Sequence, residues 1–252
     1  MYLKNKIFIL FIFFFAIVSF TGSKILNLYK ENGISYSEIK NLNLSLTTNN
    51  LERVAHAAGG YKNKTYTNSI EALNFNKNNY NYFEIDFYLN IENELLCTHN
   101  HEDQFLKLEI FLKKYDYTPC TLKTLDQWLK KNPGKVIITD IKNDNYKGLN
   151  LIKKNINDFD RKFIPQIYYP EEYHKIKKLG YKRIIWTLYR LDENKKNLDN
   201  ILNQIKKMKL HGVTMSENLV LKGYANRLKL INIPIYVHTI NSKKKFLFYK
   251  YL

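Results

Sequence analysis

Runs of apolar, β-branched and aromatic residues alternate with amphipathic helical patterns from residue 51 to residue 240, and this alternation restricts the fold more than any other feature. Strands that alternate with helices over such a length are typical of parallel α/β architecture. The helical patterns carry start and stop signals, such as Pro170 before one helix and Gly180 after it. Seven main strands are predicted, at residues 51–56, 82–89, 135–142, 163–169, 183–189, 212–216 and 233–240.

The second of these strands contains two acids, Glu84 and Asp86, that alternation places on one face. In a sheet with one open face, both carboxylates would simply lie in water. Parallel strands flanked by helices are covered on both faces, however. Two carboxylates some 6–7 Å apart would then repel each other by roughly 2–3 kcal/mol at an effective dielectric constant near 20. We therefore expect a positive group between them.

Polar residues also follow the other early strands at their C-terminal ends. His56 ends the first strand, and the third strand changes from apolar to charged at Asp140 and Lys142. The second strand is predicted to turn back through a hairpin with Asn93 in the left-handed position, and to return as a strand that ends at His99. A β/α barrel fits this pattern best, because its active residues lie at the C-terminal ends of several strands.

These residue types favour one kind of chemistry. Three carboxylates, Glu84, Asp86 and Asp140, with no cysteine or histidine pair at metal spacing, indicate a hard oxygen-rich site for Ca²⁺ or Mg²⁺. Two histidines on separate strands are suited to act as general base and general acid. A lysine adds positive charge for an anionic substrate group. Together they suit phosphodiester cleavage.

The same segments match a known family. They are residues 55–60 (AHAAGG), 66–69 (YTNS), Glu84–Asp86, His99–Asn100, Asp140–Lys142 and 235–241 (IYVHTIN). In these motifs the chain resembles the glycerophosphodiester phosphodiesterases, within the wider barrel superfamily of phosphatidylinositol-specific phospholipase C. The resemblance runs from about residue 51 to residue 242 and is most specific in its first part.

The resemblance implies a role for each matching residue. His56 and His99 would be the acid/base pair, and Lys142 would contact the substrate phosphate. The metal ligands would be Glu84, Asp86 and Asp140, with Ca²⁺ and Mg²⁺ both open as the cofactor. It also implies that a neighbouring hydroxyl of the substrate attacks phosphorus, giving a cyclic phosphate that water then opens.

The chain departs from the family pattern at several positions. Ala57 stands where the family has an arginine that contacts phosphate, and Lys62, Lys64 and Arg190 are the alternatives that we consider for that charge. The other departures are Thr67 for an acid, Asn100 for an aspartate, and His238 for a tryptophan. His238 is expected either to line the pocket or merely to pack there. These changes indicate a divergent subfamily whose substrate alcohol need not be glycerol.

The end of the chain is a further departure. Only seven main strands are predicted, and the sequence stops at Leu252 where the family has an eighth strand. We therefore expect an incomplete barrel with open strand edges. Either the N-terminal segment or a partner fills the gap, or the reading frame is truncated and the product folds poorly. A barrel that no longer catalyses and instead serves as a surface or membrane-associated binding protein is the alternative to an enzyme. A phospholipase or lyase that stops at the cyclic phosphate is the alternative within enzymes.

The N-terminus is typical of export. Lys4 and Lys6 precede an apolar run at residues 7–20, which is short for a membrane span and suited to the core of a secretory signal. Residues 1–23 are predicted to be a signal peptide or a membrane anchor, residues 24–50 a polar spacer, and residues 51–252 the barrel domain. The expected location is periplasmic, cell-surface or secreted, with membrane association through residues 7–20 if they are retained.

A net charge of +17 is compatible with binding to nucleic acid, but the distribution of the positive residues does not favour that function. Lysines are scattered along the chain, and no basic stripe with interleaved aromatic residues is present. The expected partner is a small-molecule or lipid-derived phosphodiester, and the oligomeric state stays open. Two well-separated cysteines, Cys97 and Cys120, are expected to be unpaired thiols in the core.

Overall fold

The computed structural model describes residues 53–191, 197–241 and 249, and the predicted signal and spacer lie outside this part. The chain divides into two compact units, each of which is described by itself. The larger unit comprises residues 50–216 and 228–239 and contains every described strand. The smaller includes residues 217–227 and Tyr249, whose hydroxyl donates to Glu217 Oε1 at 2.6 Å. No helix in the described ranges is long and apolar enough to span a membrane.

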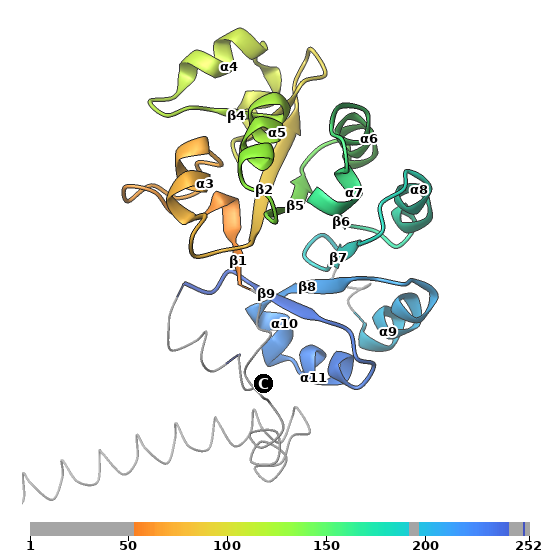
Figure 1. Cartoon of the computed structure of the whole chain (residues 1–252). Helices are drawn as coiled ribbons and strands as arrows, with labels where there is room; N and C mark the ends of the chain where they lie inside the picture. The colour runs from red at the N-terminus through yellow and green to blue at the C-terminus, as the bar shows by residue number, and fades with distance from the viewer. Residues whose placement is uncertain (1–52, 192–196, 242–248, 250–252) are drawn as a thin grey trace, which may run out of the picture. The chain divides into compact units, whose positions relative to one another are not determined.

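The elements of the larger unit alternate between strands and helices, as predicted (Figure 1). The strands are β1 Val54–Ala55, β2 Tyr82–Leu89, β3 Leu95–Cys97, β4 Cys120–Thr121, β5 Val136–Ile141, β6 Phe163–Ile167, β7 Ile185–Thr187, β8 Gly212–Ser216 and β9 Ile235–His238. The helices are α3 Ile70–Asn76, α4 Leu108–Lys114, α5 Leu122–Lys131, α6 Asn145–Asn155, α7 Phe159–Lys162, α8 Glu172–Lys178 and α9 Leu198–Lys207, with 3₁₀ turns η1 His56–Ala58 and η2 His101–Phe105. The helix α10 Glu217–Leu221 belongs to the smaller unit, and α11 Tyr224–Lys229 crosses the boundary.

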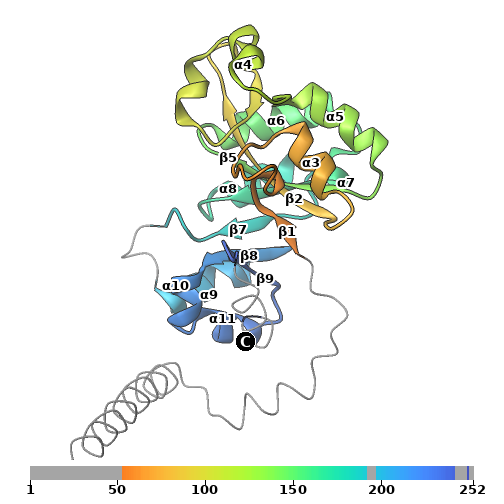
Figure 2. The same cartoon turned by 90° about the vertical axis from the view of Figure 1, so that its left-hand side faces the viewer.

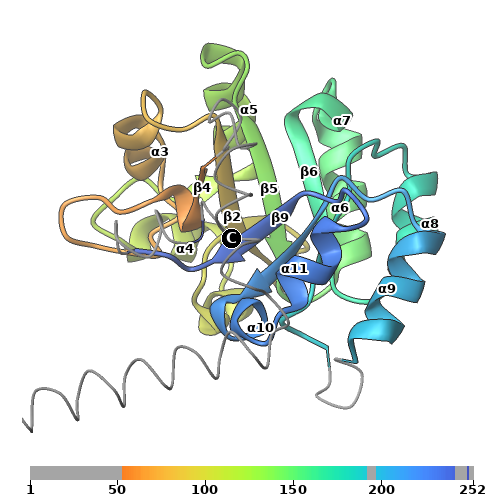
Figure 3. The same ribbon diagram turned by 90° about the horizontal axis from the view of Figure 1, so that it is seen from below.

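The strands form one sheet in the order β4-β3-β2-β5-β6-β7-β8-β9. Strand β1 is outside this row and pairs with the first residues of β2. Of the described strands, seven run parallel and only β3 and β4 are antiparallel, which confirms the number of main strands predicted from the sequence. Figure 3 shows helices such as α3, α5, α7 and α9 outside the row of strands. Among the described residues no strand joins β9 to β1, so the barrel is open there, as expected.

The sheet nevertheless curls around an apolar interior. One buried cluster combines side chains from six strands: Val136, Ile138, Ile164 and Ile185, with Val54, Tyr82 and Tyr236 packed against it. Side chains from strands that are not neighbours in the sheet meet in this way only when the sheet bends into a barrel. On the outer face, the ring of Phe83 contacts that of Trp128 on α5, with centroids 5.4 Å apart. Both faces of β2 are therefore covered, as the alternation of strands and helices along the sequence predicts.

The hairpin after β2 turns at Asn93 with a φ of 62°, the left-handed position predicted for it. Figure 2 shows α4 close to this hairpin. The hairpin also corrects one prediction, because Cys97 and Cys120 are joined by a disulfide rather than being free thiols. The two cysteines lie directly opposite each other on the antiparallel strands β3 and β4, with Cα atoms 5.1 Å apart. This pairing brings residues 23 positions apart within bonding distance.

Candidate active site

Three carboxylates meet where β2 and β5 pair. The parallel register sets Asp86 directly opposite Asp140, and Glu84 lies two residues earlier on the same face of β2. One ligand atom from each of the three lies within 4.8 Å of the others. All three are buried, with 6%, 0% and 5% of Glu84, Asp86 and Asp140 exposed. The structure therefore brings together the three acids that the sequence predicts as metal ligands.

A lysine lies among these acids. Lys142 Nζ is 2.6 Å from Asp86 Oδ1 and 2.6 Å from Asp140 Oδ2. Burial acts to lower the pKa of Lys142, but the charges of Asp140 and Asp86 outweigh it and raise the pKa. The pKa of Asp86 falls to about 2, because bonds from His99, Lys142 and Asn68 outweigh its burial. The sequence predicts a positive group between Glu84 and Asp86, but Lys142 instead lies between Asp86 and Asp140, because it follows Asp140 at the end of the strand paired with β2. Its contact with a substrate phosphate stays a prediction.

The charge of Glu84 has fewer neighbouring hydrogen-bond donors and cations than the charges of the two aspartates. Its Oε2 accepts a hydrogen bond of 2.9 Å from the backbone N–H of Ala57, which has a left-handed φ of 50° in η1. Its Oε1 is buried and has no hydrogen-bond partner among the described residues. Burial, and then the charges of Asp86 and Asp140, raise the pKa of Glu84 well above its usual value. A buried carboxylate oxygen without a donor needs a proton or a cation.

The residues fit a divalent cation. Glu84, whose Oε1 is unpartnered among the described residues, contributes one oxygen to the 4.8 Å cluster with Asp86 and Asp140. Carboxylate oxygens are the donors that Ca²⁺ and Mg²⁺ prefer. A cation at this cluster would also offset the repulsion that raises the pKa of Glu84.

Asn68 holds Asp86 in place and was not singled out from the sequence. Its Nδ2 donates to Asp86 Oδ2 at 3.1 Å, and its Oδ1 accepts from the Asp86 backbone N–H at 3.0 Å. Asn68 is fully buried and has a φ of 48°, a conformation that asparagine tolerates better than most residues. Its place in the YTNS segment, just before α3, is the signal that could have identified it.

Two tyrosines hold Asp140 from the ends of later strands. The hydroxyl of Tyr168, after β6, donates to Asp140 Oδ1, and that of Tyr189, after β7, lies 3.1 and 3.2 Å from the two Asp140 oxygens. Burial, and then the Asp140 charge, raise the pKa of Tyr168 well above its usual value and that of Tyr189 to about 12. Both hydroxyls therefore remain protonated donors. Tyrosines at the ends of apolar strands look like core residues, so sequence reasoning missed them.

Each of the two predicted histidines lies beside one of the acids. His56 Nε2 is 3.5 Å from Glu84 Oε2, and His99 Nδ1 is 3.3 Å from Asp86 Oδ2. The ring of Tyr66 lies between them, with its centroid 5.2 Å from His56 and 4.7 Å from His99. Burial lowers the pKa of His56, whereas the hydrogen bond to Asp86 raises that of His99. The environment thus gives the two imidazoles opposite proton affinities.

The residues at which the chain departs from the family pattern fall into two groups. His238 lines the site: its ring is 6.1 Å from that of Tyr189, and burial, followed by the charge of His56, lowers its pKa. Next to it, Thr239 Oγ1 lies 3.3 Å from His56 Nδ1 and links the two open ends of the sheet. Thr67 and Asn100 instead have local roles, since Thr67 contacts Ser69 and the side chain of Asn100 accepts from the backbone N–H of Glu102.

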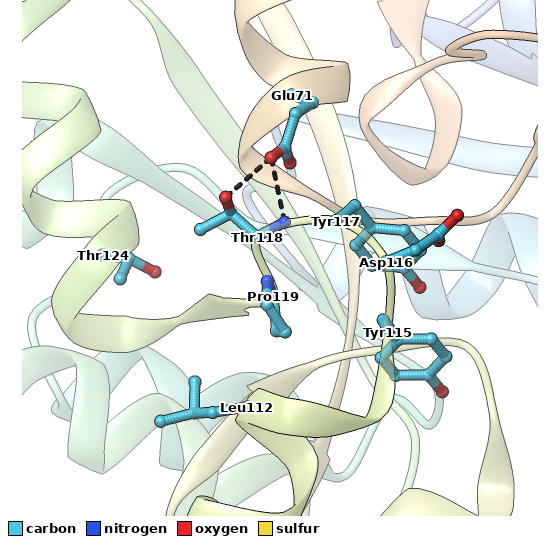
Figure 4. Close-up of a pocket in the computed structure, with 8 residues that line it drawn as sticks. All are labelled: Glu71, Leu112, Tyr115, Asp116, Tyr117, Thr118, Pro119 and Thr124. Atoms are coloured by element: carbon cyan, nitrogen blue, oxygen red, sulfur yellow. Dashed lines mark hydrogen bonds between the residues drawn. The ribbon is translucent and has the colours of Figure 1, made fainter.

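The pocket in Figure 4 does not belong to this site. It has a volume of about 500 Å³ and lies among α3, α4, α5 and the segment before β4. Its lining residues are Glu71, Leu112, Tyr115, Asp116, Tyr117, Thr118, Pro119 and Thr124. Glu71 accepts hydrogen bonds there from the N–H of Thr118 at 2.9 Å and from its hydroxyl at 2.6 Å. None of the predicted site residues lines this pocket.

Fold and site together define an open β/α barrel with an acidic centre, flanked by histidines, at the C-terminal ends of its strands. This is the location of active sites in β/α barrels. No family model matches the sequence, and no curated protein matches it either.

Solved structures match the fold. A glycerophosphodiester phosphodiesterase from Thermotoga maritima has a TM-score of 0.60 and 16% identity, over 80% of this chain and 92% of that one. One from Parabacteroides distasonis has a TM-score of 0.60 and 14% identity, over 80% and 90%. A phosphodiesterase from Oleispira antarctica, in complex with its product sn-glycerol-3-phosphate, has a TM-score of 0.62 and 12% identity, over 79% and 90%. The chain has the fold of the glycerophosphodiester phosphodiesterases.

Proposed function

We propose that the chain is a metal-dependent phosphodiesterase that hydrolyses a glycerophosphodiester, or a related lipid- or polymer-derived phosphodiester. The observation that carries the proposal is the placement of His56 and His99 beside different acids of the carboxylate cluster, with ring nitrogens 3.5 Å from Glu84 Oε2 and 3.3 Å from Asp86 Oδ2. The fold shared with glycerophosphodiester phosphodiesterases supports the same class of reaction.

The cluster of Glu84, Asp86 and Asp140 would hold a divalent cation. When bound, such an ion supplies positive charge that stabilises the phosphoryl oxygens in the transition state. Asn68 fixes Asp86, and the Tyr168 and Tyr189 hydroxyls fix Asp140, so these ligands are held in place before substrate arrives.

The histidines handle the protons. One imidazole removes the proton from the attacking oxygen, which belongs to a neighbouring hydroxyl of the substrate or to water, and a bond to phosphorus forms. The other imidazole gives a proton to the leaving alkoxide as its bond to phosphorus breaks. His56 and His99 lie on different segments, after β1 and after β3, and contact different acids, so the two imidazoles would reach different oxygens of a phosphate bound over the acids.

The test is turnover of a panel of glycerophosphodiesters by the full chain in Mg²⁺ or Ca²⁺, with products followed by phosphorus NMR. His56→Ala and His99→Ala should each lower kcat by at least about 10². His101→Ala is the matched control, because this exposed histidine contacts only its neighbour Glu102 and nearby rings. Near-normal turnover by either site variant would remove its assigned role.

A substrate with an activated leaving group separates the two roles. A nitrophenyl phosphodiester leaves without needing a proton, so the variant that lacks the general acid should lose much less activity on it than on a glycerophosphodiester. The variant that lacks the general base should lose equally on both. If both variants lose equally on both substrates, the division into acid and base fails.

One alternative has a specific observation in its favour. Lys142 already pairs with Asp86 and Asp140 at 2.6 Å, which partly neutralises the site without any metal. Such a site would suit a barrel that has lost catalysis and serves as a surface or membrane-associated binding protein. No turnover of any phosphodiester by a folded, metal-bound chain would favour that function, and accumulation of a cyclic phosphate would instead favour a lyase.

The proposal includes export to an oxidising compartment. Disulfides persist mainly outside the reducing cytosol, and Cys97–Cys120 is a disulfide between two paired strands. The apolar run at residues 7–20 supports the same location from the sequence. A reporter enzyme that is active only after export, fused behind residues 1–50, should be active. An inactive reporter would overturn the proposed location.

A further inference from the structure

The proposed substrate carries negative charge into a site that is itself acidic. Three carboxylates meet there, and the lysine that the described part of the chain places among them, Lys142, has its ammonium engaged by Asp86 and Asp140. The side chain of Ala57 is a methyl group, and its backbone N–H donates to Glu84. Another donor is therefore needed for the phosphate oxygens.

Neither nearby lysine faces this site. Lys64 Nζ pairs with the two Asp116 oxygens, at 2.7 and 2.5 Å. Lys62 lies over the ring of Tyr61, and its charge acts on Glu71 and Asp116. Both therefore belong to the surface around the pocket of Figure 4.

The arginines can be compared in the same way, since all five lie within the described ranges. Arg53 contacts Asn79 and Tyr80, and Arg183 donates to the backbone carbonyl of Arg161. Arg161 is on α7, and Arg227 lies in the smaller unit. Arg190 alone among the five has a side-chain hydrogen bond to a residue that binds Asp140.

Arg190 is held at the rim by two tyrosines. Its Nε donates to the Tyr189 hydroxyl at 3.1 Å, and that hydroxyl lies 3.1 Å from Asp140 Oδ1. Its guanidinium carbon lies 3.7 Å from the centroid of the Tyr168 ring, a cation–π distance. The same two tyrosines that orient Asp140 therefore also fix the plane of the guanidinium.

The remaining donors of Arg190 have no hydrogen-bond partner in the described part of the chain, and we expect them to be available to an anion. A guanidinium has five N–H groups, and the bond to Tyr189 uses only the one on Nε. Nη1 and Nη2 form no hydrogen bond with the residues that the structure describes. Two parallel N–H donors on a fixed plane match two oxygens of a phosphate. Arg190 follows β7, so it lies at the C-terminal end of the strands together with the acids.

We propose that Arg190 binds the phosphate of the substrate. From the loop after β7 it supplies the guanidinium that the family motif carries directly after the first histidine, where this chain has Ala57. The inference rests on the proposed phosphodiesterase function. It adds to the site a second positively charged side chain besides Lys142, on the side formed by Tyr168 and Tyr189. The arginine is thus relocated rather than lost.

The test is binding of inorganic phosphate to the full chain in saturating Mg²⁺, measured by calorimetry, because this readout does not require turnover. Arg190→Gln should weaken phosphate binding by about tenfold or more. Arg190→Lys should retain part of the affinity, since lysine keeps the positive charge but lacks the two parallel N–H donors of the guanidinium. Arg183→Gln is the matched control and should bind phosphate like the unmodified chain.

Three further outcomes decide the proposal, and the first of them separates phosphate binding from a structural role. If Arg190→Gln lowers the affinity for Mg²⁺ but leaves phosphate affinity unchanged once metal is saturating, Arg190 only supports Asp140 and the proposal is overturned. If the unmodified chain does not bind phosphate at all, the proposal is also overturned, whatever the chain hydrolyses. If phosphate binds through Arg190 while no phosphodiester is turned over, the binding site stands and the catalytic proposal fails.

Discussion

Lys142 Nζ lies 2.6 Å from Asp86 Oδ1, so the cation supplied by the end of β5 is bonded to the most buried acid of β2. Lys142 also bonds Asp140 at 2.6 Å and connects the two strands that carry the site. Breaking a buried ion pair from one side leaves the other charge uncompensated, which costs about 3–5 kcal/mol.

Replacing Lys142 with methionine should therefore destabilise the chain by about 3–5 kcal/mol in the presence of EDTA. Urea unfolding measures this, with Lys147→Met as the control, because Lys147 is exposed and its ammonium bonds only Asn93 among the described residues. Added Mg²⁺ or Ca²⁺ should recover part of the loss, since a metal ion would replace the missing charge. A loss no larger than that of the control would contradict the role of Lys142.

Asn68→Ala should cost about 3 kcal/mol of unfolding free energy. The change leaves the backbone N–H of buried Asp86 without its acceptor and removes a donor to its carboxylate, and it places alanine at a positive φ. Asn155→Ala is the control, since Asn155 is exposed and its side chain bonds only the Leu151 carbonyl. Equal stability of the two variants would show that Asn68 does not hold Asp86.

Removing the disulfide should also destabilise the chain. Cys97 and Cys120 are separated by 23 residues, and the closure of a loop of that size contributes about 3 kcal/mol. The double change of both cysteines to alanine should lower stability by about that amount. A reducing agent should then lower the melting temperature of the unmodified chain but not that of the variant. An unmodified chain indifferent to reduction would argue against the disulfide.

The stability that Glu71 contributes should depend on pH. Burial acts to raise its pKa, but the hydroxyl and N–H of Thr118 bind the carboxylate and lower it. A carboxyl with a lowered pKa in the folded state stabilises the fold above its unfolded value, about pH 4.5, and loses that contribution as the pH falls through the folded value.

Glu71→Gln should therefore lower stability at pH 7 by at most about 1 kcal/mol, since Glu71 is only half-buried and solvent screens its charge. The difference from the unmodified chain should shrink below about pH 4. Urea unfolding across this range measures it, with Glu109→Gln on α4 as the control. A difference that stays constant with pH would show that the charge on Glu71 is not involved.

Much of the site was predictable because it follows from the two-residue period of side chains in a strand and from the register of paired parallel strands. The alternation in β2 puts Glu84 and Asp86 on one face, and pairing of consecutive parallel strands then brings Asp140 opposite Asp86. The histidines were predictable because each ends a strand. The seven main strands could be counted from their apolar runs, and the opening between β9 and β1 follows from that count.

Other parts depend on contacts between distant segments. The disulfide requires β4, a strand of only two residues that carries no detectable pattern, to pair with β3. Tyr168, Tyr189 and Arg190 bind Asp140 or one another only because β6 and β7 curl around the interior. In the sequence these tyrosines are indistinguishable from core aromatic residues, so their role could not be assigned.

The most direct test of the account is a thermal melt of the full chain in EDTA and then in millimolar Mg²⁺ or Ca²⁺, beside the double variant Glu84→Gln/Asp86→Asn. A cation that binds only the folded state stabilises it by about 2.7 kcal/mol at a hundredfold excess over Kd. We predict a cooperative melt that metal raises in the unmodified chain and leaves unchanged in the variant. A cooperative melt of the unmodified chain that is indifferent to both ions would contradict the metal site.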